Sequence, residues 1–205
     1  MFFWQEKLGW HIEVKRLKQF LSSFQQVNSI KIYQGYFEGN KVAEQELLDW
    51  ESWGLEVRKK PIKEINISID LTPFRSDDTT VINRVMLKQL VKKLPVKSIQ
   101  IINKEIRELN SNGIKKLSMH KCNFDVEMAS DMRIDSRDDE KIKTFVVWSG
   151  DSDFVDTVNA LGSDNKKVAI FSTKGMISYE LSHSKAYFYD VKNIKNFICW
   201  NKEIG

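Results

Sequence analysis

The 205-residue chain has little of what marks secreted, zinc-binding or membrane proteins. Its two cysteines, Cys122 and Cys199, are far apart and form neither a disulfide framework nor a zinc pattern. The three histidines show no metal-ligand spacing. No apolar run approaches the roughly 20 residues of a membrane span, and the first residues lack the basic start and apolar core of a signal peptide. We therefore expect a reduced, cytoplasmic protein with no membrane partner.

The composition is that of a globular protein, with 41% hydrophobic and 29% charged residues. This length suits one domain with a sizeable core, and there is no internal repeat or low-complexity tract. The net charge of +4 permits a polyanion as partner without requiring one. We predict a single domain over residues 1–205, interrupted by an insertion at about residues 64–120.

The second half of the chain alternates between strand and helix patterns. Residues 145–148 form a short apolar run, which is typical of a strand buried on both faces. A polar turn at 149–153 and an apolar, helix-compatible segment at 154–161 follow. Residues 167–172 and 186–189 are predicted strands as well. Such alternation predicts an α/β fold with a parallel sheet and helices on both faces.

The first half predicts helices at 13–25 and 41–53 and strands at 29–37 and 55–60. Within the insertion we expect a strand at 65–71, a helical hairpin made of 79–94 and 96–109, and a polar, basic lead-in at 115–123. The hairpin would cover the domain or dimerise it, or it would form a lid over a site. Packing is the favoured interpretation because apolar stripes usually pack, and a homo-oligomer is left open.

Two carboxylates, Asp151 and Asp153, follow the strand at 145–148 and lie two residues apart in a turn. In open α/β sheets ligands bind at the carboxyl ends of the strands. Two carboxylates about 4 Å apart repel by about 1 kcal/mol in water and about 4 kcal/mol at an effective dielectric of 20. A hard cation such as Mg²⁺ converts this repulsion into binding. In the alternative, Asp153 caps the following helix and Asp151 satisfies the turn.

Further candidates lie on the helix predicted at 124–134 and at the carboxyl edge of the sheet. Asp125 is in the first helical turn, where the helix dipole alone also favours a negative charge. Asp131 is about 9 Å further along the helix axis, so we do not expect it to share a single ion with Asp125. Lys121 and Lys174 could contact phosphates, whereas the basic run at 58–60 is interpreted mainly as a solvated surface.

These motifs, in this order, resemble the NYN domain of the PIN-like nuclease superfamily, also called the LabA/DUF88 group. The resemblance rests on Lys121 and FDVEMASD at 124–131, on SGDSDF at 149–154, on Gly162 and KVAIF at 167–171, and on Ser178 with Leu181. It covers most of residues 8–62 and 121–200. SGDSDF at a strand end is its most specific element.

The resemblance implies a Rossmann-like fold and an acidic cluster that binds Mg²⁺ or Mn²⁺ and hydrolyses RNA phosphodiester bonds. Asp125, Asp151 and Asp153 would form the metal and catalytic cluster, and Asp131 matches a further acidic position of the family. Ser149, Lys121 and Lys174 are predicted to contact the RNA.

The chain departs from the family pattern at its start. The family begins with a strand that ends in Asp and, shortly after, Asn (D-x-x-N), and residues 1–4 are all that could represent this strand here. We expect the natural protein to begin upstream. If it does not, the chain has lost one ligand, and a catalytically silent, nucleic-acid-binding or regulatory protein becomes the alternative. A phosphatase that uses paired aspartates and Mg²⁺ ranks last. It needs an aspartate nucleophile in a D-x-D at the end of the first strand, and no D-x-D lies near the start of this sequence.

Overall fold

The structure is a computed structural model in which residues 8–200 are described. The strand remnant expected at residues 1–4 lies outside the described residues. The chain separates into two compact units: unit 1 comprises residues 1–60 and 123–205, and unit 2 comprises residues 61–122. The prediction that unit 2 is an insertion in one family domain stays a prediction.

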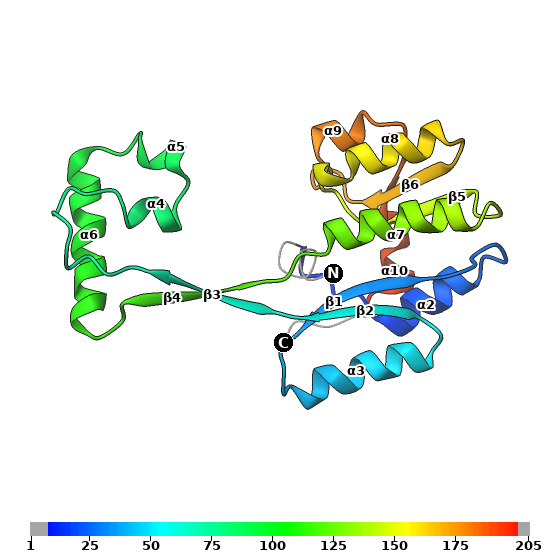
Figure 1. Cartoon of the computed structure of the whole chain (residues 1–205), viewed down its shortest axis with the longest axis horizontal. Helices are drawn as coiled ribbons and strands as arrows, with labels where there is room; N and C mark the ends of the chain where they lie inside the picture. The colour runs from blue at the N-terminus through cyan, green and yellow to red at the C-terminus, as the bar shows by residue number, and fades with distance from the viewer. Residues whose placement is uncertain (1–7, 201–205) are drawn as a thin grey trace. The chain divides into compact units, whose positions relative to one another are not determined.

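Unit 1 is built on a parallel sheet with the strand order β5-β6-β7 (Figure 1). Its strands are β5 (Thr144–Val147), β6 (Lys167–Ser172) and β7 (Tyr187–Asp190). Val147 lies beside Ile170, and Ile170 lies beside Phe188, so the carboxyl ends of all three strands meet at one edge. The sequence prediction of a parallel sheet in this half is confirmed.

Helices cover both faces of this sheet, as predicted. Phe145, Val147 and Ile170 point to one face and form a buried cluster with residues of three helices, α7 (Asp125–Asp138), α8 (Val155–Ser163) and α9 (Tyr179–Ser182). The other face presents Trp148 and Phe171, whose rings are 5.2 Å apart. They pack against a second cluster formed with α2 (Val14–Ser22), η2 (Val191–Ile194) and α10 (Lys195–Ile198).

A second pair of strands in unit 1 comes from the first part of the chain. Strands β1 (Lys31–Tyr36) and β2 (Glu56–Pro61) are hydrogen-bonded neighbours, with α3 (Lys41–Ser52) between them in sequence. Gly54 follows α3 with φ of 83°, a left-handed conformation that suits glycine. The predicted helix at 41–53 and the predicted strands on either side of it are therefore confirmed.

Unit 2 contains an antiparallel ladder of β3 (Lys63–Ser68) and β4 (Lys116–Lys121). Lys63 pairs with Lys121 at one end, and Ser68 pairs with Lys116 at the other. The segment 115–123, predicted only as a polar, basic lead-in, contains the strand β4, which its side-chain pattern did not predict. The segment is polar, but its backbone groups find partners on β3, and side-chain polarity does not reveal such pairing.

Three helices complete unit 2: α4 (Ile82–Val85), α5 (Lys88–Val91) and α6 (Val96–Ser111). The single helix expected at 79–94 is wrong, because the backbone is extended at Met86 and Leu87. Ile82 and Val91 are both buried in one cluster with Ile99. Residues nine apart lie on opposite sides of a straight helix, so both can enter this cluster only if the helix breaks between them.

Polar side chains of α6 fix the loop that precedes α4. The amide of Asn103 is fully buried and donates hydrogen bonds to the carbonyls of Ser76 (2.9 Å) and Asp78 (2.7 Å). Arg107 donates to the carbonyl of Phe74 at 2.6 Å. Unit 2 is therefore held by buried polar contacts as well as by two small apolar clusters.

Candidate metal centre

The turn after β5 is shaped by its own side chains. The backbone N–H of Asp151 donates to the Ser149 hydroxyl at 3.1 Å, and that of Asp153 donates to Asp151 Oδ1 at 3.0 Å. Asp151 thereby caps the short 3₁₀ helix η1 (Ser152–Phe154), which leads into α8. The capping alternative thus applies to Asp151 instead of Asp153. It uses only one oxygen of the Asp151 carboxylate.

Gly150 allows this turn to lie against the loop that follows β6. A Cβ atom on Gly150 would be 1.9 Å from the Met176 carbonyl oxygen, closer than any real contact. The Gly150 carbonyl also accepts a hydrogen bond of 2.7 Å from the backbone N–H of Ser178. The glycine is therefore required by a close backbone approach, which positions the flanking carboxylates.

The first residue of α7 brings a third carboxylate to the turn. The backbone N–H of Asp125 donates to Asn123 Oδ1 at 2.7 Å, which fixes the start of the helix. One carboxylate oxygen from each of Asp125, Asp151 and Asp153 lies within 4.8 Å of the others. We call these three residues the acidic trio. Asp125 is half-buried, whereas the other two are exposed.

The environment of Asp125 disfavours its charge. Burial raises the pKa of its carboxyl, and the negative charges of Asp151 and Asp153 raise it further, against the opposing effect of Asn123. Dipole stabilisation at the helix start therefore does not by itself account for the position of Asp125. A bound cation would reverse this penalty, because it would attract all three carboxylates.

The donor set of the acidic trio fits a hard divalent cation. Three carboxylates at one exposed sheet edge are the oxygen ligands that Mg²⁺ and Mn²⁺ prefer, and the open side leaves room for further ligands. No histidine or cysteine takes part in the cluster, so a soft or imidazole-bound metal is a poorer match.

Asp131, the fourth predicted acidic residue, points elsewhere. Its Oδ2 accepts a hydrogen bond from the Tyr33 hydroxyl at 2.8 Å and pairs with Arg58 Nε at 3.1 Å. Burial tends to raise the pKa of Asp131, but the Tyr33 hydrogen bond and the charges of Arg58 and Lys31 outweigh it and lower the pKa. Asp131 thus lies outside the acidic trio, as expected from its position about 9 Å along the helix axis from Asp125.

Asp131 belongs to an acidic stripe of α7 that faces β1 and β2. Glu127 pairs with Lys60, and Asp135 pairs with Lys31 at 2.6 Å. Residues 127, 131 and 135 are four apart and share one side of the helix. The remaining cation of the run at 58–60 also has a partner, since Lys59 pairs with Glu51. The run is thus neutralised by ion pairs, which speaks against its contacting nucleic acid.

The three residues predicted to contact RNA fall in different places. Ser149 supports the turn through its hydrogen bond from Asp151. Lys174 is exposed on the loop after β6, two residues before the Met176 carbonyl that lies against Gly150. Lys121 ends β4 and belongs to unit 2. Within unit 1, the structure therefore brings Ser149 and Lys174 to the edge that carries the acidic trio.

Sequence reasoning missed the polar end of β6. The side chains of Ser172 and Thr173 are each 1% exposed, and their hydroxyls find no hydrogen-bond partner within residues 8–200. Ser172 Oγ lies 3.0 Å from the position that a Gly150 Cβ would occupy. The only signal in the sequence was polarity at the end of an apolar strand, which is also typical of an ordinary loop.

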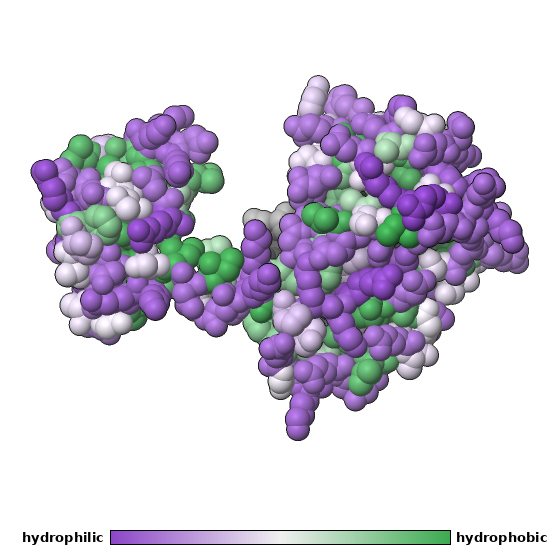
Figure 2. Space-filling model, viewed as in Figure 1, coloured by the Kyte–Doolittle hydropathy of each residue, from purple (hydrophilic) through white to green (hydrophobic). Residues whose placement is uncertain are grey.

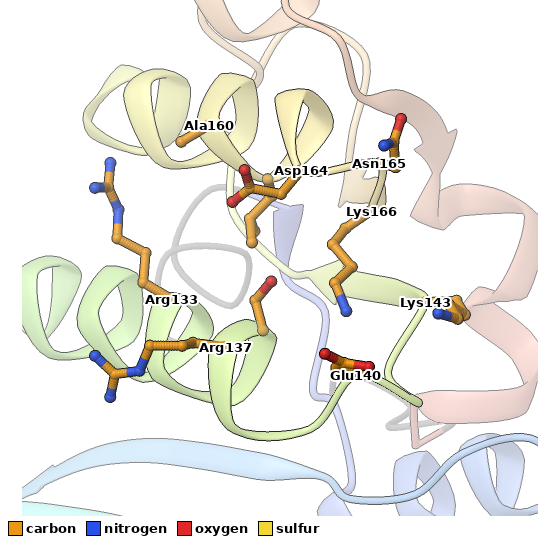
Figure 3. A pocket seen from close by; sticks show the side chains of 10 residues that line it. Arg133, Arg137, Glu140, Lys143, Ala160, Asp164, Asn165 and Lys166 are labelled. Carbon is orange, nitrogen blue, oxygen red and sulfur yellow. The ribbon is translucent and has the colours of Figure 1, made fainter.

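A pocket of about 650 Å³ lies at the opposite end of α7 from Asp125 (Figure 3). Arg133 and Arg137 line it from α7, and Asp164 and Lys166 line it after α8. In Figure 3 the Lys166 side chain extends toward Glu140, and its amine donates to the carbonyl of Ile142 at 2.6 Å. The pocket shares no lining residue with the acidic trio, and it mixes charges of both signs.

The chain is similar to one protein family and to one curated protein. The profile of the family described as NYN domain matches residues 83–194, which is more than half of the chain. The low amplitude and bright protein LabA of Synechococcus elongatus is 27% identical over 95 residues. This alignment covers 46% of the chain and 50% of LabA, so the chain spans about half the length of that relative. No solved structure matches the chain at a significant level.

No helix within residues 8–200 has the length and hydrophobicity needed to cross a bilayer.

Proposed function

Because the chain belongs to the NYN domain family, a group of the PIN-like nucleases, we propose that it is a ribonuclease dependent on Mg²⁺ or Mn²⁺. The observation that carries the proposal is the convergence of Asp125, Asp151 and Asp153 from two separate helix starts. Three carboxylates within 4.8 Å of one another repel, and within residues 8–200 no ion pair with a lysine or arginine offsets this repulsion.

In this proposal each group of the site has its own task. Asp125, Asp151 and Asp153 hold the cation, which when bound polarises the scissile phosphate and lowers the pKa of a water. The second role of Asp151, capping η1, fixes the direction of its carboxylate. Gly150 and Ser149 hold the turn in place. Lys174, exposed at the same edge, would contact a substrate phosphate.

A catalytically silent, RNA-binding or regulatory protein is the second candidate. It is favoured by the engagement of Asp131, which matches an acidic position of the family but is held by Tyr33 and Arg58. With Asp131 in these contacts, the cluster offers three carboxylates, two of them exposed. Such a cluster could bind a cation weakly without supporting hydrolysis.

The deciding experiment pairs metal binding with RNA cleavage. Melting temperatures are measured with increasing Mn²⁺ or Mg²⁺, because a ligand that binds only the folded state raises stability, by about 2.7 kcal/mol at 100 times its Kd. Cleavage of a labelled RNA is then followed with the same metal. We expect Asp151→Asn to remove the metal-induced stabilisation and to slow cleavage by on the order of 100-fold or more.

The matched control is Asp156→Asn. Asp156 is an exposed carboxylate in the first turn of α8 and lies outside the acidic trio. The Asp156→Asn variant should keep both the metal-induced rise in melting temperature and the cleavage of RNA. Metal-induced stabilisation without RNA cleavage would favour the silent protein. Cleavage that survives in Asp151→Asn would refute the assignment of the site.

A further inference from the structure

Charge is unevenly divided between the two units. Unit 2 has 12 Lys and Arg against 6 Asp and Glu, a net charge of +6. Unit 1 has 20 against 22, a net charge of −2. The unit with the acidic trio therefore repels a polyanion, and its basic run at 58–60 is already neutralised by Glu51, Glu127 and Asp131.

The positive charge of unit 2 is concentrated in one stretch. Between Asp78 and Glu105 the chain has six cations and no carboxylate. All six are exposed: Arg84, Lys88, Lys92, Lys93, Lys97 and Lys104. We call them the basic stretch. Arg84 donates to the Ser68 carbonyl at 3.0 Å, whereas no ion pair involves the five lysines within the described residues. Figure 2 shows hydrophilic side chains over much of this unit, with hydrophobic ones between them.

The placement of Lys97 is not explained by helix stability. Lys97 is in the first turn of α6, where the helix dipole disfavours a positive charge, and that turn contains no acidic residue. Surfaces of small domains usually intersperse both signs, since like charges repel. A stretch of one sign is typical of a surface that attracts an oppositely charged partner.

The helices of unit 2 hold the basic stretch together. Ile82 of α4, Val91 of α5 and Ile99 of α6 share one buried cluster, so the three helices form one packed body. Lys97 and Lys104 are seven residues apart on α6, two turns or about 10.5 Å along one side of the helix. This side is opposite to the buried Ile99 and Asn103.

We propose that the basic stretch of unit 2 is an RNA-binding surface that contacts the phosphate backbone. This inference rests on the proposed function, for which RNA is the substrate, and adds a binding surface outside the acidic trio. Phe74 is the one aromatic residue of unit 2, so base stacking contributes little here. Binding is therefore sequence-independent and steeply dependent on salt.

An anionic membrane surface fits the basic stretch less well. Leu87 and Val96 are exposed beside the lysines, as they would be in an interfacial helix. However, α4 and α5 have four residues each, and the apolar stripe of α6 is buried inside unit 2. The stretch also lacks the Trp and Phe residues that anchor interfacial helices.

The test compares three variants of the full chain with the parent. Lys92→Gln/Lys93→Gln/Lys97→Gln removes three charges and keeps helix-compatible side chains. Lys92→Arg/Lys93→Arg/Lys97→Arg keeps the charges. Three exposed lysines of unit 1 that form no ion pair with another described residue provide the control: Lys41→Gln/Lys141→Gln/Lys192→Gln. Binding of a fluorescein-labelled oligouridylate is measured by fluorescence anisotropy. EDTA removes divalent metal, so the RNA is not cleaved during the measurement. The titration is repeated between about 0.05 and 0.2 M KCl.

We expect the first variant to bind about 100-fold more weakly at 0.1 M salt and its salt slope to fall by about 2, since each lost phosphate contact contributes ~0.7 to the slope for single strands. The arginine and control variants should bind within a few-fold of the parent. Circular dichroism checks that each variant is folded.

The proposal is overturned if the glutamine variant binds RNA like the parent, or if the unit 1 control loses as much affinity. It is also overturned if the glutamine variant keeps its RNA affinity but no longer binds phosphatidylserine vesicles, which would identify a lipid surface. Failure of the proposed function is distinguished by the cleavage assay. In that case the parent would not cleave RNA in the presence of metal, regardless of how the lysine variants bind RNA in EDTA.

Discussion

Unit 1 and unit 2 differ in how they are built and in what they expose. Unit 1 has a parallel sheet covered by helices, a negative net charge and the acidic trio at the sheet edge. Unit 2 has an antiparallel ladder, three helices and a net charge of +6. A cluster of carboxylates for a cation would repel a polyanion, so in the proposed function the attraction to RNA is better supplied by a different part of the chain.

The two units are also stabilised by different contacts. Unit 1 is stabilised by an apolar core, in which Phe154, Val158 and Ile170 are almost fully buried. The backbone at Gly150 also lies close to the Met176 carbonyl. Unit 2 has smaller apolar clusters and depends on Asn103 and its neighbours on α6. We therefore expect separate unfolding transitions. All six tryptophans lie in unit 1, so tryptophan fluorescence follows unit 1 alone, and amide exchange of α6 follows unit 2.

The largest stability effect should come from Gly150→Ala in unit 1. The new Cβ would overlap the Met176 carbonyl at 1.9 Å, so the backbone of one loop must move, at a cost of about 3 kcal/mol. Tryptophan fluorescence during urea unfolding should show this loss, while exchange of α6 stays unchanged.

Gly39→Ala is the matched control for Gly150→Ala. Gly39 also lies in unit 1 and has φ of 81°, with no heavy atom within 4 Å of the position of a Cβ. Only the left-handed backbone opposes the substitution, which should cost about 1 kcal/mol. Equal losses in the two variants would contradict the importance of the close approach.

Asn103→Ala should have the next largest effect, and in unit 2. It removes the two hydrogen bonds that the fully buried Asn103 amide donates to the carbonyls of Ser76 and Asp78, at a cost of about 2 kcal/mol. Exchange of α6 amides should accelerate, while tryptophan fluorescence reports an unchanged transition for unit 1. Gln100→Ala, an exposed change on the same helix, should be nearly neutral. A parallel loss in both units would mean that they unfold together.

The smallest effects concern pH and have opposite signs in the two units. The pKa of Asp125 is raised by burial and by its acidic neighbours, so the folded state is penalised once pH rises above 3.8, the ordinary pKa of an aspartate. Asp125→Asn should therefore stabilise unit 1 at pH 7 without metal. This gain in stability should vanish as pH falls below 3.8, because Asp125 is then protonated and neutral in both the folded and the unfolded parent.

Asp70→Asn in unit 2 should do the opposite. Hydrogen bonds from Thr72 and Lys115 lower the pKa of Asp70 to about 2, so its ionised form stabilises the fold above 3.8, the ordinary pKa of an aspartate. That stability is lost as pH falls through about 2. The variant should thus be less stable at pH 7 and equal to the parent in strong acid. Urea unfolding across pH measures both variants, and equal signs would contradict the comparison.

Local pattern was enough to predict the elements that carry the candidate site. The apolar run of β5, the turn with Asp151 and Asp153 and the helix start at Asp125 were all predicted, because each depends on neighbours in sequence. The requirement for Gly150 was not visible, since the Met176 carbonyl that demands it comes from the loop after another strand. The partners of Asp131, from β1 and β2, were invisible for the same reason.

The sequence by itself determined the parallel α/β character of unit 1, the strand ends that carry the carboxylates and the family resemblance. These depend on periodicity and on short motifs, which are properties of adjacent residues. Tertiary structure alone decided that α4 and α5 are separate helices, that β4 pairs with β3, and that the basic run at 58–60 is neutralised. Each of these is settled by a partner distant in sequence, because burial, strand pairing and ion pairing are contacts that a local pattern does not contain.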